Sequence, residues 1–233
     1  MTSKRIAFLG QKPVGVQCLK ILINFFGASS IRFVLTNLDP TGWWQNSEVS
    51  ETARSHGIAV LDQDTTTETQ LVEMLAKNSI ETLISVQYPK IISRAVLAQV
   101  NFRAFNVHLA KLPSYRGWHA ASHAILNGDK TFGVSIHKID SGIDSGEIVC
   151  ESIFEIRKDI TVGELYYLSE IHGINLFKKF CEKLALGDIQ GVPQVGVVQY
   201  YYKNELETRL RSGVDEELAA RASDFSYRLR INL

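Results

Sequence analysis

Residues 104–117 read A-F-N-V-H-L-A-K-L-P-S-Y-R-G, and residues 132–148 read F-G-V-S-I-H-K-I-D-S-G-I-D-S-G-E-I. Each stretch begins with an apolar run typical of a buried strand and ends in a polar loop. A second apolar run follows at 147–156, and the loop at 140–146 that separates the two runs is too short for a parallel crossover. We therefore predict an antiparallel pair of strands over 132–139 and 147–156.

The chain before this stretch alternates between strand and helix patterns. Apolar runs predict strands at 5–10, 31–36, 58–61, 81–87 and 103–108. Helical spacing predicts helices at 14–26, 47–56 and 65–77, and a short one from Ser93, with Thr65 and Glu68 forming a capping box for the third. This order predicts an α/β fold with a mostly parallel, Rossmann-like sheet.

The chain after the antiparallel pair predicts one long helix and a small extension. Thr161 and Glu164 form a capping box, and Gly187 is the expected end of that helix. Residues 195–202 predict a further strand, and a charged helical tail follows. We expect a catalytic domain over 1–190 and a short C-terminal extension with β-structure over 191–233.

Composition excludes several classes of protein. The 233 residues carry 25 basic and 25 acidic side chains, whereas a large nucleic-acid surface usually needs a basic excess. The sequence contains no apolar run of about 18 residues, so it predicts no membrane-spanning helix. No cleavable signal is evident at the N-terminus. The scattered cysteines Cys18, Cys150 and Cys181 are expected to be reduced thiols of a cytoplasmic protein.

The candidate chemistry lies where the predicted strands end. Asn106 and His108 are two residues apart, so on a strand their side chains point to the same face. Asp144 follows in the second polar loop. An amide that can donate to an oxyanion, an imidazole that can accept a proton and a carboxylate suit acyl transfer to an amine.

Other chemistries fit the residues less well. A serine hydrolase would need a G-x-S-x-G elbow, which is absent. The loop at 140–146 lacks the ligand and glycine positions of a calcium loop. His119 and His123 have the spacing of two metal ligands on a helix, but no H-E-x-x-H pattern or nearby cysteine supports a metal site. We expect no metal.

The motifs N-x-H, L-P-x-Y-R-G and D-x-G-x-D-x-G, in this order, resemble those of the 10-formyltetrahydrofolate-dependent formyltransferase family. The resemblance covers roughly forty residues and implies that Asn106, His108 and Asp144 are the catalytic residues. Ala110 and Ala120 stand where family members often have Ser and Pro. These two departures bear on loop shape and acceptor subclass, because neither removes a catalytic group.

The resemblance also implies a set of binding residues. Two segments would seat the pterin of 10-formyltetrahydrofolate, largely through backbone groups: Gln87, Tyr88, Ile91 and Ile92 in one, and Ile139, Asp140 and Gly142 in the other. The residues expected to contact the acceptor are Gln11, Lys12, Tyr115, Arg116 and Tyr201. Lys12 lies in the first strand-to-helix turn, where it could serve a pyrophosphate or simply stand in a tight turn.

The run S-V-Q-Y at 85–88, together with Trp43-Trp44 and Tyr200-Tyr201-Tyr202, looks like the family members that formylate nucleotide-linked amino sugars. The resemblance thus implies a dTDP-linked 3-amino or 4-amino dideoxyhexose as acceptor and bacterial surface polysaccharide synthesis as the pathway. The tyrosines of 195–203 are too apolar for a free arm, and a strand there could pair with a second subunit, so we expect a homodimer.

Four alternatives stay open. One is glycinamide ribonucleotide formylation, and another is hydrolysis of formyltetrahydrofolate, although hydrolase members carry an extra N-terminal domain. A third is formylation of tRNA, whose enzymes carry a sizeable extra C-terminal domain. From a different class, the chain could bind folate or a nucleotide without catalysis.

Overall fold

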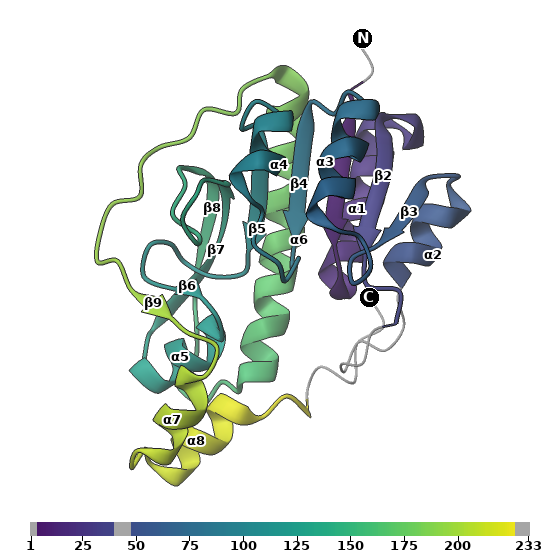
Figure 1. The fold of residues 1–233 in the computed structure, drawn as a ribbon. Helices are drawn as coiled ribbons and strands as arrows, with labels where there is room; N and C mark the ends of the chain where they lie inside the picture. The colour runs from purple at the N-terminus through teal and green to yellow at the C-terminus, as the bar shows by residue number, and fades with distance from the viewer. Residues whose placement is uncertain (1–3, 40–47, 227–233) are drawn as a thin grey trace.

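The structure of the chain is a computed structural model, which describes residues 4–39 and 48–226. The predicted aromatic pair Trp43 and Trp44 lies outside the described residues. A seven-stranded sheet forms the centre of the molecule, with strand order β3-β2-β1-β4-β5-β7-β8 (Figure 1). Its strands are β1 (Ile6–Gly10), β2 (Ile31–Thr36), β3 (Ala59–Asp62), β4 (Thr82–Val86), β5 (Ala104–His108), β7 (Thr131–Lys138) and β8 (Ile148–Glu155).

The strand directions confirm the predicted fold class. Strands β3, β2, β1, β4 and β5 pair in parallel, whereas β7 pairs antiparallel with both β5 and β8. The order reverses between β1 and β4, which is the point where open α/β sheets form a crevice at the carboxyl ends of their strands.

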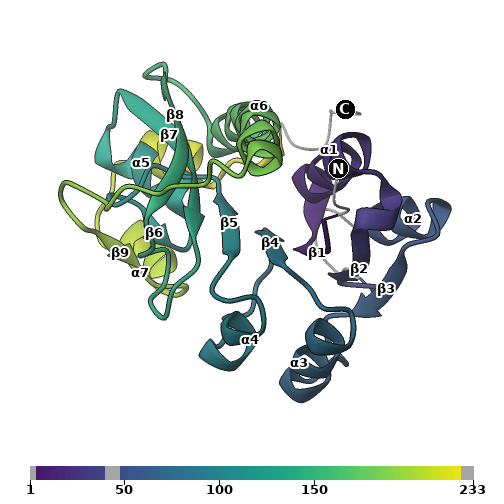
Figure 2. The same ribbon diagram turned by 90° about the horizontal axis from the view of Figure 1, so that it is seen from above.

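Helices cover both faces of the sheet (Figure 2). On one face, α1 (Lys12–Phe26), α2 (Glu48–Ser55) and α6 (Val162–Leu186) bury apolar side chains against the sheet in one hydrophobic cluster. On the other face, α3 (Glu68–Lys77) and α4 (Arg94–Gln99) form a second cluster. This layering buries β1 and β4 along their whole length, which fits their mostly apolar sequences.

Two capping boxes begin helices, one of them a residue or two from its predicted place. Thr161 and Glu164 cap α6, and Gly187 ends it in the left-handed conformation, as predicted. The predicted pair Thr65 and Glu68 is wrong: Thr67 caps α3 together with Gln70. The reason is local, because the Thr65 hydroxyl donates to the Asp62 carboxylate at 3.3 Å instead.

The C-terminal segment packs on the antiparallel side of the sheet. Its strand β9 is only Tyr200–Tyr201 and pairs in parallel with β6 (Arg116–Gly117), so the predicted strand over 195–202 is wrong in length. Val195, Val197 and Val198 are exposed and pair with no strand of the described chain. The predicted helical tail comprises α7 (Glu205–Arg211) and α8 (Glu216–Ser223).

A third hydrophobic cluster joins this segment to α5 (Ala120–Asn127) and to the start of α6. Within the described ranges, no helix is long and apolar enough to span a membrane.

Candidate active site

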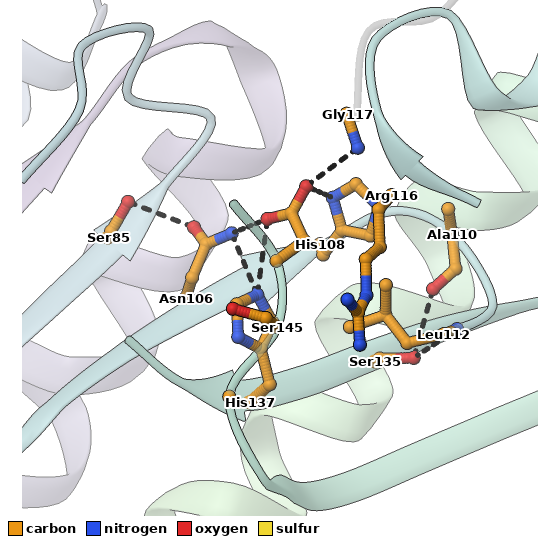
Figure 3. A network of polar contacts seen from close by, with 12 residues as sticks. Ser85, Asn106, His108, Ala110, Leu112, Arg116, Gly117, Ser135, His137 and Ser145 are labelled. Atoms are coloured by element: carbon orange, nitrogen blue, oxygen red, sulfur yellow. Dashed lines mark hydrogen bonds and ion pairs between the residues drawn. The ribbon is translucent and has the colours of Figure 1, made fainter. Parts of the chain in front are cut away.

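Three polar side chains form a row across neighbouring strands at the carboxyl end of the parallel sheet. Ser85 of β4 is in register with Asn106 of β5, which is in register with His137 of β7. Residues in register on adjacent strands point to the same face of a sheet. Figure 3 shows the three side chains lying toward one another.

This row sets the orientation of the Asn106 amide. The Ser85 hydroxyl donates to Oδ1 of Asn106 at 2.9 Å, so the NH₂ group faces the other way. Nδ2 lies 3.3 Å from Nε2 of His137 and 3.5 Å from Oδ1 of Asp144. Both distances are long for hydrogen bonds, so an incoming stronger acceptor can compete for the two N–H groups at little cost.

Asp144 lies at the centre of the site. Its carboxylate is 3.6 Å from Nδ1 of His108 and 3.4 Å from Nε2 of His137, and it accepts a hydrogen bond of 2.9 Å from the Gly117 amide. Burial alone would raise the pKa of Asp144, but the two imidazoles and the Gly117 amide hold that pKa well below its usual range. The carboxyl is therefore ionised at neutral pH.

His108 has an oxygen beside each ring nitrogen. Nε2 donates to the carbonyl of Tyr115 at 2.7 Å, since a carbonyl can only accept, and Nδ1 faces Asp144. A neutral ring satisfies one of these two acceptors, whereas an imidazolium satisfies both. The two oxygens thus fix the orientation of the His108 ring at the site.

The loop after β5 is anchored to β7 beside these residues. The Ser135 hydroxyl donates to the Ala110 carbonyl at 3.0 Å and accepts from the Leu112 amide at 3.3 Å (Figure 3). His108 and Ser135 are in register on β5 and β7, so the same alternation that aligns Asn106 with His137 places this anchor.

A second polar cluster lies where the strand order reverses. Nζ of Lys12, directly after β1, donates to Oε1 of Gln87, directly after β4, at 3.1 Å. The Tyr166 hydroxyl from α6 donates to the same oxygen at 3.3 Å. Gln11 is buried, and its backbone amide donates to the Val86 carbonyl at 3.2 Å. These three sequence-predicted residues, Gln11, Lys12 and Gln87, are therefore neighbours.

The two segments expected to seat a pterin pack against the same hydrophobic cluster. Tyr88 and Ile139 are partly buried against the second cluster, of which Ile92 is a buried member. Ile91, Asp140 and Gly142 are exposed. Partial burial raises the pKa of Tyr88 to about 12, so its hydroxyl stays protonated.

Two of the residues predicted to contact an acceptor lie in the core. Tyr115 is 3% exposed and Tyr201 is 1% exposed, and their rings stack at 5.5 Å. The Tyr115 hydroxyl donates to Asp129 at 2.6 Å, and Asn127 donates to both tyrosine hydroxyls. Burial raises the pKa of Tyr115 well above its usual range, and the hydrogen bond to Asp129 raises it further. Through these buried side chains the 113–118 loop is anchored to the third hydrophobic cluster, and the contacts of Tyr115 and Tyr201 with an acceptor stay predictions.

Arg116 lies at the site, where it meets a residue that the sequence did not single out. Its guanidinium donates to Oε1 of Gln194, and Gln194 donates onward to the backbone of the Asp144 loop. Ser85 and His137 also lie at the site, although the sequence analysis did not predict them as site residues. Polar side chains at inward positions of otherwise apolar strands were their signal, whereas Gln194 had none.

Among residues 4–39 and 48–226, no cluster of three His, Cys, Asp or Glu side chains could hold a metal ion. His119 is in the left-handed conformation just before α5, and His123 is buried against the Tyr201 ring at 4.0 Å.

Comparison with known proteins identifies the family. A family model described as formyl transferase matches residues 4–174. The chain belongs to the formyl transferase family. It is 30% identical over 194 residues to the methionyl-tRNA formyltransferase of Agathobacter rectalis, an alignment covering 82% of this chain and 62% of that protein. The chain thus spans less than two thirds of that relative's length.

Solved structures share the fold. An N-formyltransferase from Helicobacter canadensis, crystallised with folinic acid and dTDP-3-aminofucose, has a TM-score of 0.76 and 24% identity, covering 94% of this chain and 80% of that one. Phosphoribosylglycinamide formyltransferase from Streptococcus pneumoniae has a TM-score of 0.66 and 24% identity, covering 78% of this chain and 99% of that one. At such identities the likeness is one of fold.

Proposed function

We propose that this protein transfers the formyl group of 10-formyltetrahydrofolate to the primary amine of a nucleotide-linked dideoxyamino sugar. The observation that carries the proposal is the meeting of Asn106 and His108 around Asp144, each within 3.6 Å of its carboxylate. An oxyanion donor and a proton acceptor set on one carboxylate are what formyl transfer to an amine requires.

In the proposed reaction, the amine nitrogen attacks the formyl carbon and the carbonyl oxygen becomes an oxyanion. The Asn106 NH₂ group, whose orientation Ser85 sets, exchanges its long contact with His137 for a hydrogen bond to that oxygen. Such a donor is typically worth about 10²–10³ in rate. Collapse of the intermediate breaks the bond to N10 of the folate, which leaves with a proton.

His108 accepts the proton that the attacking amine must lose, directly or through a water. The resulting imidazolium has one N–H facing the Tyr115 carbonyl and the other facing Asp144. The ionised Asp144 stabilises that cation and can pass a proton toward the departing folate nitrogen. His137 contacts the other oxygen of the Asp144 carboxylate, on the side away from His108, and so holds the carboxylate near Asn106.

The folate co-substrate would be held beside this centre by the segments 87–92 and 139–142. Both segments pack against the second hydrophobic cluster, where Tyr88 and Ile139 could contact the apolar face of the pterin. Backbone groups of the exposed residues could then bind the polar edge of the pterin. Lys12 and Gln87, joined at the strand-order reversal, lie at the carboxyl ends of β1 and β4, where a phosphate of the acceptor could bind.

Two observations favour a small nucleotide sugar as acceptor. The formal net charge is zero, which does not suit a tRNA surface. The fold likeness to the N-formyltransferase solved with dTDP-3-aminofucose extends over 94% of this chain, against 78% for the purine enzyme. We propose dTDP as the carrier, and the cytoplasm, where folates and nucleotide sugars occur, as the location.

A parallel assay tests the acceptor. The protein would receive 10-formyltetrahydrofolate with a dTDP-amino sugar, glycinamide ribonucleotide, methionyl-tRNA or buffer alone, and tetrahydrofolate release and formylated product would be measured. We expect the dTDP-amino sugar to be formylated fastest. Faster formylation of the ribonucleotide or the tRNA would replace the acceptor, and folate binding without turnover in any arm would disprove the enzyme.

A further inference from the structure

Residues 191–199, here called the strap, lie between α6 and β9 (Figure 1). The strap contacts both polar loops of the site. Val192 forms a bridge to Ile148, directly after the Asp144 loop. Gln199 exchanges backbone hydrogen bonds of 3.1 Å with the 113–117 loop, at Pro113 and Arg116. The strap lies outside the residues 4–174 that match the family model.

The Gln194 side chain joins the two loops to each other. Its Nε2 donates to the carbonyl oxygens of Asp144 and Gly146, each at 2.8 Å. Its Oε1 accepts from Nε and Nη2 of Arg116 at 3.1 and 2.8 Å. An amide has two N–H groups and two lone pairs, so this side chain uses its full hydrogen-bonding capacity within the site.

The backbone conformation of Asp144 must be maintained by hydrogen bonds of this kind. Its φ of +50° is a left-handed conformation that non-glycine residues rarely adopt and that surrounding contacts must maintain. Gln194 donates hydrogen bonds to the carbonyls on either side of Ser145. These bonds set the two peptide planes and with them the direction of the Asp144 side chain.

We propose that Gln194 is the positioning residue that keeps the Asp144 carboxylate between His108 and His137 while orienting the Arg116 guanidinium at the edge of the site. This inference rests on the proposed function for its kinetic consequence alone, because the geometry can be measured without turnover. It also explains how a segment beyond the family match would govern the catalytic carboxylate.

The test uses two variants and a matched control. Gln194→Ala removes every contact, whereas Gln194→Glu keeps the size and the acceptor for Arg116 but loses both donated hydrogen bonds. Gln199→Ala is the control, because Gln199 lies on the same strap with an exposed side chain and contacts the loop through its backbone. The readouts are hydrogen exchange of the Gly117 amide, which reports its bond to Asp144, and kcat with the folate Kd.

We expect both Gln194 variants to speed Gly117 exchange and to lower kcat by about 10- to 100-fold, the cost of a small misplacement at a reacting centre, while the folate Kd stays unchanged. Gln199→Ala should match the wild type. Unchanged exchange and kcat in Gln194→Glu would overturn the inference even if Gln194→Ala failed to fold. A wild type that formylates no acceptor would disprove the proposed function, and Gly117 exchange would still decide the role of Gln194.

Discussion

The Gly117 amide donates a hydrogen bond of 2.9 Å to Oδ2 of Asp144. This bond joins the two polar loops that follow β5 and β7, which are distant in sequence. Gly117 also belongs to β6, whose partner β9 comes from the C-terminal segment. The position of the proposed catalytic carboxylate is therefore linked to both the 113–117 loop and the end of the chain.

Gly117→Ala should damage this link. The residue has a φ of +91°, and a Cβ there would lie 2.3 Å from the Tyr201 carbonyl oxygen, so the amide must move away from Asp144. We expect lower turnover and a loss of stability larger than that of Gly128→Ala. Gly128 has a φ of +69° with nothing within 4 Å of an added Cβ, so Gly128→Ala reports left-handed strain alone, about 1–2 kcal/mol. Equal effects in the two variants, measured by chemical denaturation, would contradict the prediction.

His108→Asn should leave folding and folate affinity nearly intact while lowering kcat by at least about 10²-fold, the usual contribution of a general base. The asparagine can keep a hydrogen bond near the Tyr115 carbonyl but cannot accept the proton. Steady-state kinetics and folate titration measure the two quantities. A near-normal rate would rule out His108 as the base.

Asp144→Asn should lower kcat similarly and change its pH profile, because the charge beside two imidazoles is lost. Since the folded-state pKa of Asp144 is depressed below its ordinary 3.8, the ionised group stabilises the wild type above that pH, and this stabilisation is lost as the pH falls through the folded-state pKa. Thermal unfolding below pH 4 should thus depend less on pH in the variant. A wild-type kinetic pH profile would mean that Asp144 only shapes its loop.

His123 predicts a second pH dependence, in stability. Burial, with Arg209 adding to it, lowers the pKa of His123 to about 4 from an ordinary 6.5. The neutral ring therefore contributes stability that is complete above pH 6.5 and declines as the pH falls toward 4. His123→Phe keeps a ring against Tyr201 and removes the titration, so its unfolding midpoint should fall less between these pH values. Parallel curves for both proteins would refute this assignment.

The exposed valines of the strap predict a homodimer. Val195 is 87% and Val197 78% exposed, and neither pairs with a strand of the described chain, which leaves an apolar edge for a second copy. We expect light scattering to show a dimer that Val197→Asp weakens. Leu186→Asp, at an equally exposed site at the end of α6, is the control. A monomeric wild type would count against the dimer.

The order of the elements could be predicted because it follows from local patterns. Apolar runs of strand length and the capping box at Thr161 each act within a few residues, and short connections restrict which strands can pair. The predicted strand at 195–202 is wrong in length, because a strand also needs a pairing partner, which local sequence does not specify. Its β-prone valines pair with no strand among residues 4–39 and 48–226, and within this segment a strand forms at Tyr200 and Tyr201, where β6 supplies backbone groups.

The site divides in the same way. The sequence by itself determined Asn106 and His108 as a pair, because alternation along a single strand places them on one face, and it placed Asp144 in a polar loop beyond a second strand. Tertiary structure alone decided that His137 and Ser85 complete the row, because strand register brings residues together regardless of their separation in the chain. It also placed Tyr115 and Tyr201 in the core and Gln194 at the centre of the loops, because burial and long-range hydrogen bonding depend on the packing of the whole chain.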